Sequence, residues 1–315
     1  MASFRHQIRP QPSDPEMPGT AVPLSALSQV GVPCSVRRGL PLPGRLRIGD
    51  LDLDLGNGRP ASARGLGSED GPAPSAPLWL TDREIDAPMA TWRRLFDLSP
   101  ETGLWPLVLT PLGTEGCERP WDSGELEPAP VAAIDGIDPG AVLAEGWADG
   151  LVPIGAQPYV GHLRPFGREF PGLSAAGLHG GRPASVQTDA LARGGRARIG
   201  LVPCARPADA VATIGWQGAI NRRSAVELSA VLRSWEDRHG IVLAGLGFAT
   251  VTLLVPHPPA DEAEAHALAA ELAALCPDVL AEDGPVDGFG LAGDGTLAGL
   301  ARLLVGRPVW KLWWD

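Results

Sequence analysis

Five polar residues around one predicted helix form the group most suited to chemistry in this sequence. Carboxylates close to an amide and an arginine suit a hydrolase-type enzyme acting on a small molecule or a nucleotide. In this hypothesis Glu236 or Asp237 works together with Asn221 and an arginine. The whole group is Asn221, Arg222, Arg233, Glu236 and Asp237.

The same side chains also fit two hypotheses without catalysis. Arg233 and Asp237 are four residues apart on the polar side of the helix, so we expect them to pair with each other. A solvated, salt-bridged helix face of this kind stabilises a protein by at most a few tenths of a kcal/mol. The other hypothesis is a partner-binding face. His239 falls near the buried side at the helix end, which leaves the carboxylates without an obvious basic histidine.

The helix that carries these residues is the best specified element of the chain. Ser224 and Glu227 form an S-x-x-E capping box at its start, and Gly240 supplies its C-terminal stop. Its apolar residues recur at three- and four-residue spacing and predict one buried face, made of Leu228, Val231, Leu232 and Trp235.

The elements around this helix predict an α+β fold. Two strands, 241–247 and 250–255, are too close in sequence for anything but a tight turn, so they form an antiparallel hairpin. From Arg198 onward the expected order is β-α-α-β-β-α-α-β. This order predicts a mixed sheet with the hairpin packed against helices.

Tryptophan is unusually frequent, with ten residues against one tyrosine. The last segment, 308–314, is predicted to be extended, so that Trp313 and Trp314 face opposite ways. One of the two is then expected to be exposed at a groove or a partner surface. Because tryptophan is common at binding hot spots, we add Trp216, Trp313 and Trp314 to the candidate binding residues.

The chain divides by composition into three parts. Residues 1–19 are predicted to be a disordered tail, 20–190 a loop-rich α+β region, and 198–315 a C-terminal domain. Within the second part, the Gly/Pro/Ser-rich residues 56–77 are predicted to form a flexible loop. Pro106 places the strand 104–109 at a sheet edge, or at least at a strand start.

Charge and cysteine spacing exclude several classes of protein. The net charge of −11 argues against a general nucleic-acid binder and against attachment to an anionic membrane. The four cysteines have no metal-ligand spacing, and we expect neither a metal nor a cofactor. With no export signal or membrane span predicted, free thiols and a cytoplasmic location are expected.

Several strings in the C-terminal part resemble one known family. They are Gly200–Pro203, the string LSAVLRSWEDR at 228–238, Cys276–Asp278 and Trp313–Asp315. Together they resemble the domain-of-unknown-function family numbered 4253 over roughly residues 198–315. That family has no assigned activity, so the resemblance implies a fold and no chemistry. It also implies an aspartate where this chain has Ala249, which weakens any catalytic role for the hairpin turn.

Three functions follow as expectations. The first is a cytosolic, non-enzymatic protein-interaction module of the immunity or toxin-neutralising kind, suggested by the acidic charge and the Trp-rich C-terminal part. The second is the hydrolase described above. The third is a small-ligand-binding module without turnover.

Overall fold

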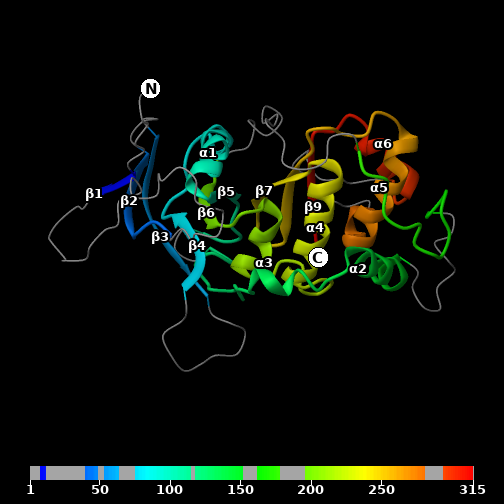
Figure 1. Ribbon diagram of the computed structural model, residues 1–315, viewed down its shortest axis with the longest axis horizontal. Coiled ribbons are helices and arrows are strands. Elements are labelled where there is room, and N and C mark those ends of the chain that lie inside the picture. Colours follow the sequence, from blue (N-terminus) through cyan, green and yellow to red (C-terminus); the bar gives the residue numbers. More distant parts are fainter. Residues whose placement is uncertain are drawn as a thin grey trace.

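One mixed β-sheet runs through the molecule (Figure 1). The computed structural model describes residues 8–11, 40–48, 53–63, 75–114, 118–151, 162–177, 196–280 and 294–314. Within these ranges the sheet has nine strands in the order β1-β2-β3-β4-β6-β5-β7-β8-β9. The strands are β1 (Ile8–Gln11), β2 (Gly44–Ile48), β3 (Leu53–Ser62), β4 (Ser75–Thr81), β5 (Leu104–Leu109), β6 (Arg198–Pro203), β7 (Val242–Leu246), β8 (Thr250–Leu254) and β9 (Val309–Trp313). Among them, β5 and β7 are the one parallel pair.

The helices gather mostly around the C-terminal half of this sheet. They are α1 (Pro88–Thr102), α2 (Pro139–Gly146), α3 (Ala210–Ile214), α4 (Ala225–His239), α5 (Glu262–Leu275) and α6 (Leu297–Leu304). Short helical turns are η3 (Val131–Ala133), η4 (Trp147–Leu151), η7 (Pro207–Asp209) and η8 (Pro277–Leu280). Strands β1 to β4 lie at one end of the molecule, and α5 and α6 lie at the other (Figure 1). None of the helices described is both long enough and apolar enough to cross a membrane.

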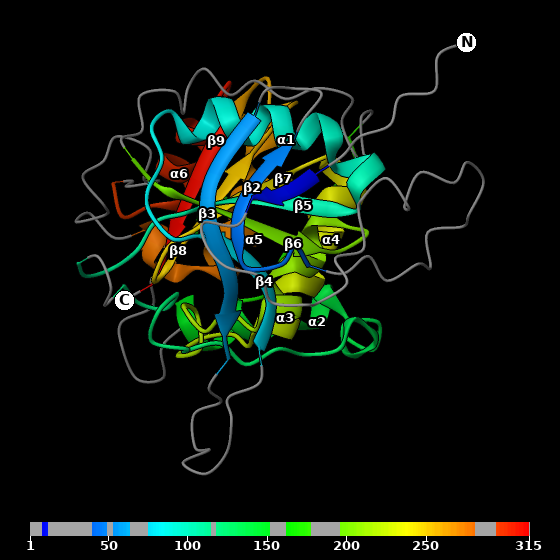
Figure 2. The same cartoon turned by 90° about the vertical axis from the view of Figure 1, so that its left-hand side faces the viewer.

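Helices cover both faces of the sheet, as the alternation of side chains along β6 shows. Ile199 and Leu201 pack with Leu95 and Leu98 of α1. Val202, which points the other way, belongs to the core formed with α3, α4 and α5. Figure 2 shows α1 and α3 on opposite sides of the strands. The predicted α+β fold, with helices packed against a mixed sheet, is therefore confirmed.

The predicted order of elements from Arg198 onward is also confirmed, as β6-α3-α4-β7-β8-α5-α6-β9. The hairpin of β7 and β8 is antiparallel. Helix α4 has the complete capping box of Ser224 and Glu227, and Gly240 ends it with a φ of 65°. Trp235 is fully buried against the core.

Strand β6 joins the two halves of the chain. It is the first strand of the segment 198–315, yet it lies between β4 and β5, which come from the preceding region. The division into the region 20–190 and the domain 198–315 remains a sequence prediction. In space, the two parts share one sheet and one main core.

Two predictions for the N-terminal part are wrong. Ile8–Gln11 forms strand β1, although we expected a disordered tail over 1–19. Residues 56–62 and 75–77 belong to β3 and β4, although a flexible loop was expected over 56–77. Strands β3 and β4 each pair with a neighbouring strand on both sides, and this pairing outweighs the low strand propensity of glycine. At Gly58 a side chain would lie 2.3 Å from the Trp79 ring, so the packing itself requires glycine. Residues 1–7, 12–19 and 64–74 fall outside the described residues.

Pro106 does not mark a sheet edge, because β5 lies between β6 and β7. Its missing N–H is tolerated because β7 pairs with β5 only from Val108 onward. Its carbonyl accepts a hydrogen bond from Trp92 Nε1 at 2.8 Å.

Candidate functional site

The structure separates the candidate residues into two places. Asn221, Trp313 and Trp314 line a cavity of about 690 Å³. Arg233 and Asp237 line a different, shallower groove beside α4. Asn221 and Asp237 therefore do not meet in one cavity, although the hydrolase hypothesis needs them together.

The cavity lies where the two parallel strands end. Thr110 follows the last residue of β5, and Phe248 and Ala249 follow β7 in the hairpin turn. The backbone N–H of Thr110 donates to the Leu246 carbonyl at 3.0 Å, which holds the two strand ends together. In open α/β sheets, ligands bind in the crevice outside the carboxyl ends of parallel strands. The remaining wall comes from strand β9, the loop 217–221 and the residues Pro111, Leu112, Arg119, Pro120 and Glu125.

The loop before α4 is held tightly against the hairpin turn. Trp216 is buried and its Nε1 donates to the Gly247 carbonyl at 2.8 Å. At Gly218 a Cβ would lie 2.0 Å from the Trp216 ring and 2.3 Å from the Phe248 carbonyl oxygen. Only glycine allows this approach, so Gly218 sets the position of Gln217 and Asn221 at the cavity.

A bidentate ion pair forms one wall of the cavity. Arg119 Nε donates to both carboxylate oxygens of Glu125, at 3.0 and 2.9 Å, and the guanidinium lies 4.5 Å from the centre of the Phe248 ring. The hydrogen bond from Arg119 lowers the pKa of Glu125. The carboxylate therefore stays charged at neutral pH and is a poor general base.

Buried charge fixes the segment that carries Arg119. Arg198 of β6 is 2% exposed, and its Nη1 lies 2.8 Å from Glu118 Oε2 and 3.1 Å from Asp122 Oδ1. Leu112 and Arg119 exchange two backbone hydrogen bonds. This wall of the cavity is therefore anchored to the centre of the sheet.

Strand β9 forms the opposite wall. Lys311 and Trp313 are half-buried and line the cavity, whereas Leu312 is fully buried. Trp314 is 3% exposed and packs edge-on against Trp216, with ring centres 5.9 Å apart. Trp313 is half-buried and Trp314 is buried, and both belong to the cavity wall.

Ala249 lies in the cavity wall as well. The aspartate that the family resemblance implies at this position would bring a carboxylate to the cavity. In this chain the position is a methyl group. Arg222, by contrast, is exposed next to Asn221 and is not part of the cavity wall.

The expected pairing of Arg233 with Asp237 is wrong. Arg233 pairs with Asp209 and, at 2.7 Å, with Asp135, while Asp237 pairs with Arg206 at 2.7 Å. Segments distant in sequence dock on this helix face, which a helical wheel cannot reveal. The docked segments therefore cover part of this helix face, and ion pairs connect them to it.

Glu236 is buried under the same network. Its Oε2 accepts from the Ala208 N–H at 3.2 Å, and Arg206 lies 3.4 Å from Oε1. Burial raises the pKa of this carboxyl, and Arg206 opposes the rise. Its contacts attach η7 to α4 and reach neither Asn221 nor the cavity.

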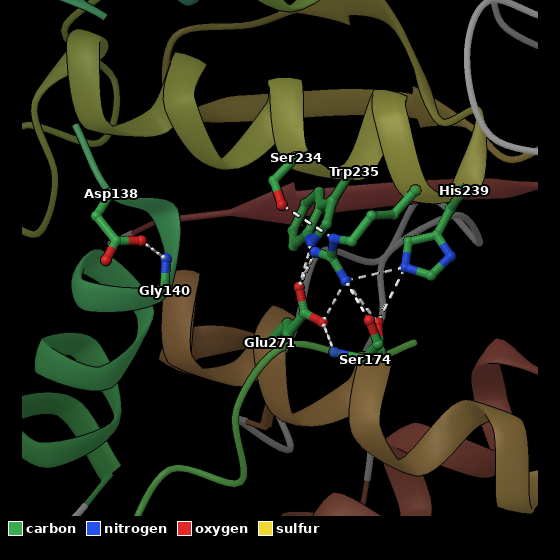
Figure 3. A network of polar contacts seen from close by, with 8 residues as sticks. Asp138, Gly140, Ser174, Ser234, Trp235, His239 and Glu271 are labelled. Carbon is green, nitrogen blue, oxygen red and sulfur yellow. Dashed lines mark hydrogen bonds and ion pairs between the residues drawn. The ribbon is translucent and has the colours of Figure 1, made fainter. Parts of the chain in front are cut away.

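A buried polar network between α4 and α5 escaped the sequence prediction (Figure 3). Glu271 is fully buried and accepts from Trp235 Nε1 at 2.8 Å, from the Ser174 N–H at 2.6 Å and from Arg238 Nη1 at 2.9 Å. Burial alone would raise the pKa of Glu271, but Arg238 and Ser174 lower it overall. The one sequence signal for this network was Glu271 itself, a glutamate inside the apolar stripe of α5.

Ser174 and His239 lie within this network, with Oγ 2.9 Å from Nε2. This spacing suits a nucleophile and its base. However, Arg238 Nη1 also contacts both atoms, at 2.8 and 3.2 Å, and it donates to the Ser174 carbonyl at 2.9 Å. Burial, followed by Arg238, lowers the pKa of His239. The network therefore fastens the segment around Ser174 to α4 and α5.

The described residues include no cluster of three or more His, Cys, Asp or Glu side chains suited to a metal ion. Comparison with curated proteins found no match, and neither did comparison with solved structures. Residues 198–315 match a family model, which confirms the resemblance noted from the sequence. The matched part contains α4, the hairpin and β9, and it is similar to the family described as "Domain of unknown function (DUF4253)".

Proposed function

We propose that the protein is a small-ligand-binding module whose ligand occupies the cavity at the ends of β5 and β7. The observation that carries this proposal is the cavity of about 690 Å³, lined by Trp313, Phe248 and a few polar side chains. Ligand sites in proteins typically have volumes of this order and combine apolar walls with a small number of oriented polar groups.

The rigidity of the walls supports the same proposal. Gly218 and Trp216 hold one wall, and Arg198 anchors another through buried ion pairs. A preorganised site loses little conformational entropy when it binds a ligand.

The polar groups near the cavity support binding better than turnover. Glu125 has a lowered pKa and is paired with Arg119, and the buried carboxyl of Glu236 belongs to a different network. General acid–base catalysis needs a group whose pKa lies near the working pH, within reach of the substrate.

A protein-interaction module of the immunity kind is the second candidate. Leu112 and Ile220 are each 50% exposed, and both belong to the cavity wall. Apolar side chains exposed together are typical of surfaces that contact other proteins. The net charge of −11 would favour a basic partner. The free thiol of Cys276 fits the cytoplasmic location that we propose with it.

Ligand-observed NMR with a library of small fragments tests the first candidate. We expect a subset of fragments to compete for one site on the full-length protein. Ala249→Trp, which fills the cavity, should abolish their binding. Ala205→Trp is the matched control, because Ala205 is exposed and outside the cavity wall.

The two candidates respond differently to substitution. Ile220→Asp puts a charge on an exposed apolar residue and should disrupt a protein interface there, whereas Ala249→Trp should abolish fragment binding. If fragments bind equally well to Ala249→Trp and to the unmodified protein, the cavity is not the ligand site.

A further inference from the structure

We propose that the ligand is an uncharged nitrogen heterocycle of the nucleobase kind, stacked on Trp313 with its polar edge toward Thr250. This inference rests on the proposed function and specifies the chemistry of the ligand. It follows from which side chains at the cavity already have partners, and from the pairing of β8 with β9.

The charged side chains of the cavity wall are already engaged. Arg119 and Glu125 form the bidentate pair described above, and Glu125 also accepts from Ser123 Oγ at 2.8 Å. Lys311 has an interaction of its own as well. Within the described part of the wall, Arg119, Glu125 and Lys311 are the charged residues. A charged ligand would lose hydration without meeting an unpaired countercharge, so the wall favours an uncharged one.

Trp313 provides a flat surface in this wall. Phe248 is covered by the guanidinium of Arg119, 4.5 Å from its ring centre, and Trp314 packs against Trp216. The half-buried indole of Trp313, in contrast, has no ring or cation contact with any residue that the structure describes. Bases stack on aromatic side chains with little regard to ring type, because every base has a π-face. The indole of Trp313 therefore suits a planar ring.

The backbone around Trp313 is held on two sides. Its carbonyl accepts from Cys276 Sγ at 2.9 Å, and the N–H of the next residue, Trp314, donates to the Ala249 carbonyl at 3.0 Å. A surface that is fixed before binding loses little conformational entropy when a ring stacks on it.

The register of the strands places hydroxyl groups beside this surface. Thr250 and Trp313 are direct partners in the antiparallel pair of β8 and β9. Direct partners point to the same face of a sheet, with Cβ atoms about 5 Å apart. Thr110 approaches from the end of β5: a Cβ at Gly247 would lie 2.7 Å from Thr110 Oγ1 and 2.3 Å from Thr250 Oγ1. A ring that stacks on Trp313 therefore brings its edge to these hydroxyls.

The polar groups around that edge are neutral. Asn221 adds an exposed amide in the loop wall. The side chains of Thr110, Thr250 and Asn221 have no hydrogen-bond partner among the residues that the structure describes. Hydroxyl and amide groups both donate and accept hydrogen bonds, so they can pair with the ring nitrogens, N–H groups and carbonyls of a nucleobase.

Calorimetry on the full-length protein tests this inference, with adenosine and uridine as the probes. We expect both nucleosides to bind. Adenosine monophosphate, which adds a phosphate, should bind no more tightly than adenosine. Methyl glucoside, which has hydroxyls but no aromatic ring, should not compete with either probe.

Substitutions in the wall should weaken adenosine binding to different degrees. Trp313→Ala should weaken it roughly tenfold to a hundredfold, the loss expected for one stacked base, and Trp313→Phe should restore most of it. Thr250→Val keeps the shape but removes the hydroxyl, and should weaken binding roughly threefold to tenfold. Thr114→Val is the matched control, because Thr114 is exposed and outside the cavity wall.

Fluorine NMR gives a readout that a merely structural role of Trp313 would not move. With 5-fluorotryptophan in place of the ten tryptophans, the ¹⁹F signal missing from the Trp313→Phe protein is that of Trp313. Adenosine should shift this signal, because the stacked base adds a ring current. The signals of tryptophans outside the cavity wall, such as Trp92, should stay in place.

The outcomes separate this inference from the proposed function. The inference is wrong if fragments bind while neither nucleoside does, or if methyl glucoside or adenosine monophosphate binds more tightly than adenosine. An unchanged affinity of Trp313→Ala for adenosine, or an unshifted Trp313 signal, would also overturn it. If neither the nucleosides nor any fragment binds, both proposals fail.

Discussion

The cavity and the α4–α5 network contain similar polar residues in opposite circumstances. Around Glu271 the carboxylate is fully buried, Arg238 is half-buried, and each is bound by neighbouring side chains. At the cavity, Asn221 is exposed and lies in the wall of a hollow of about 690 Å³ that solvent reaches. The difference shows that side chains of types common in active sites can have a purely structural role. The candidate binding site is instead defined by its place at the ends of β5 and β7. The predictions below test this contrast, from the largest expected effect to the smallest.

The isolated segment 198–315 should not fold cooperatively. Without the preceding region, β6 loses both of its neighbours, β4 and β5, and the Ser174 contacts to Glu271 and Arg238 disappear. We expect a broad, non-cooperative thermal transition by circular dichroism, against a sharp one for the full chain. A sharp transition of the fragment would show that the family domain is independent of the region before it.

Glu271→Gln should destabilise the protein by about 3 kcal/mol or more, because it leaves Arg238 as a charge without its buried partner. Urea unfolding followed by tryptophan fluorescence measures the change. Glu262→Gln is the matched control, since Glu262 is exposed on the same helix and should change stability by less than about 1 kcal/mol. Equal effects of the two substitutions would mean that the network is not a structural clamp.

Gly218→Ala should cost about 1–3 kcal/mol and also weaken fragment binding, because the added methyl group overlaps the Trp216 ring. Gly136→Ala is the control: its Cβ would meet nothing within 4 Å. Both variants are compared by urea unfolding and by ligand-observed NMR. A Gly218→Ala protein that keeps full fragment binding would show that the loop does not shape the cavity.

Stability should fall as the pH drops below about 6.5, the ordinary pKa of histidine. His239 has a lowered pKa in the folded state, so between its folded and ordinary values the unfolded chain binds more protons. The stability that neutral His239 contributes is thus fully present above about pH 6.5, and it declines as the pH falls toward the folded pKa. His239→Gln should flatten the profile of urea midpoints in that range, whereas His266→Gln, on the surface of α5, should leave it unchanged.

Asp237→Asn should change the free energy of unfolding by less than about 1 kcal/mol, because Asp237 is 62% exposed in its pair with Arg206. Fragment binding should also be unchanged, since Asp237 lies outside the cavity wall. Loss of ligand binding in this variant would indicate that the functional site lies on the face of α4.

Local patterns predicted the elements of the C-terminal part well. The capping box of Ser224 and the stop at Gly240 depend on residues close in sequence. The same local rules failed at Pro106 and over 56–62, because pairing with distant strands decided those structures.

The candidate site was predicted only in part. Asn221, Trp313 and Trp314 do line one cavity, but Glu236 and Asp237 belong to ion-pair networks elsewhere. Arg119 could not be assigned from the sequence, because it reaches the cavity wall only when distant segments meet. The Ser174 contacts to Glu271 were hidden for the same reason.

The sequence by itself determined the order of the C-terminal elements, their caps, the buried faces and the resemblance to the family, since these depend on spacing along the chain. The tertiary structure decided the insertion of β6 between β4 and β5, the partners of each charge and the position of the cavity. The physical reason is the separation along the sequence over which each kind of interaction acts. Helix caps and side-chain alternation act over a few residues, whereas ion pairs and cavity walls join side chains that only the packed sheet brings together.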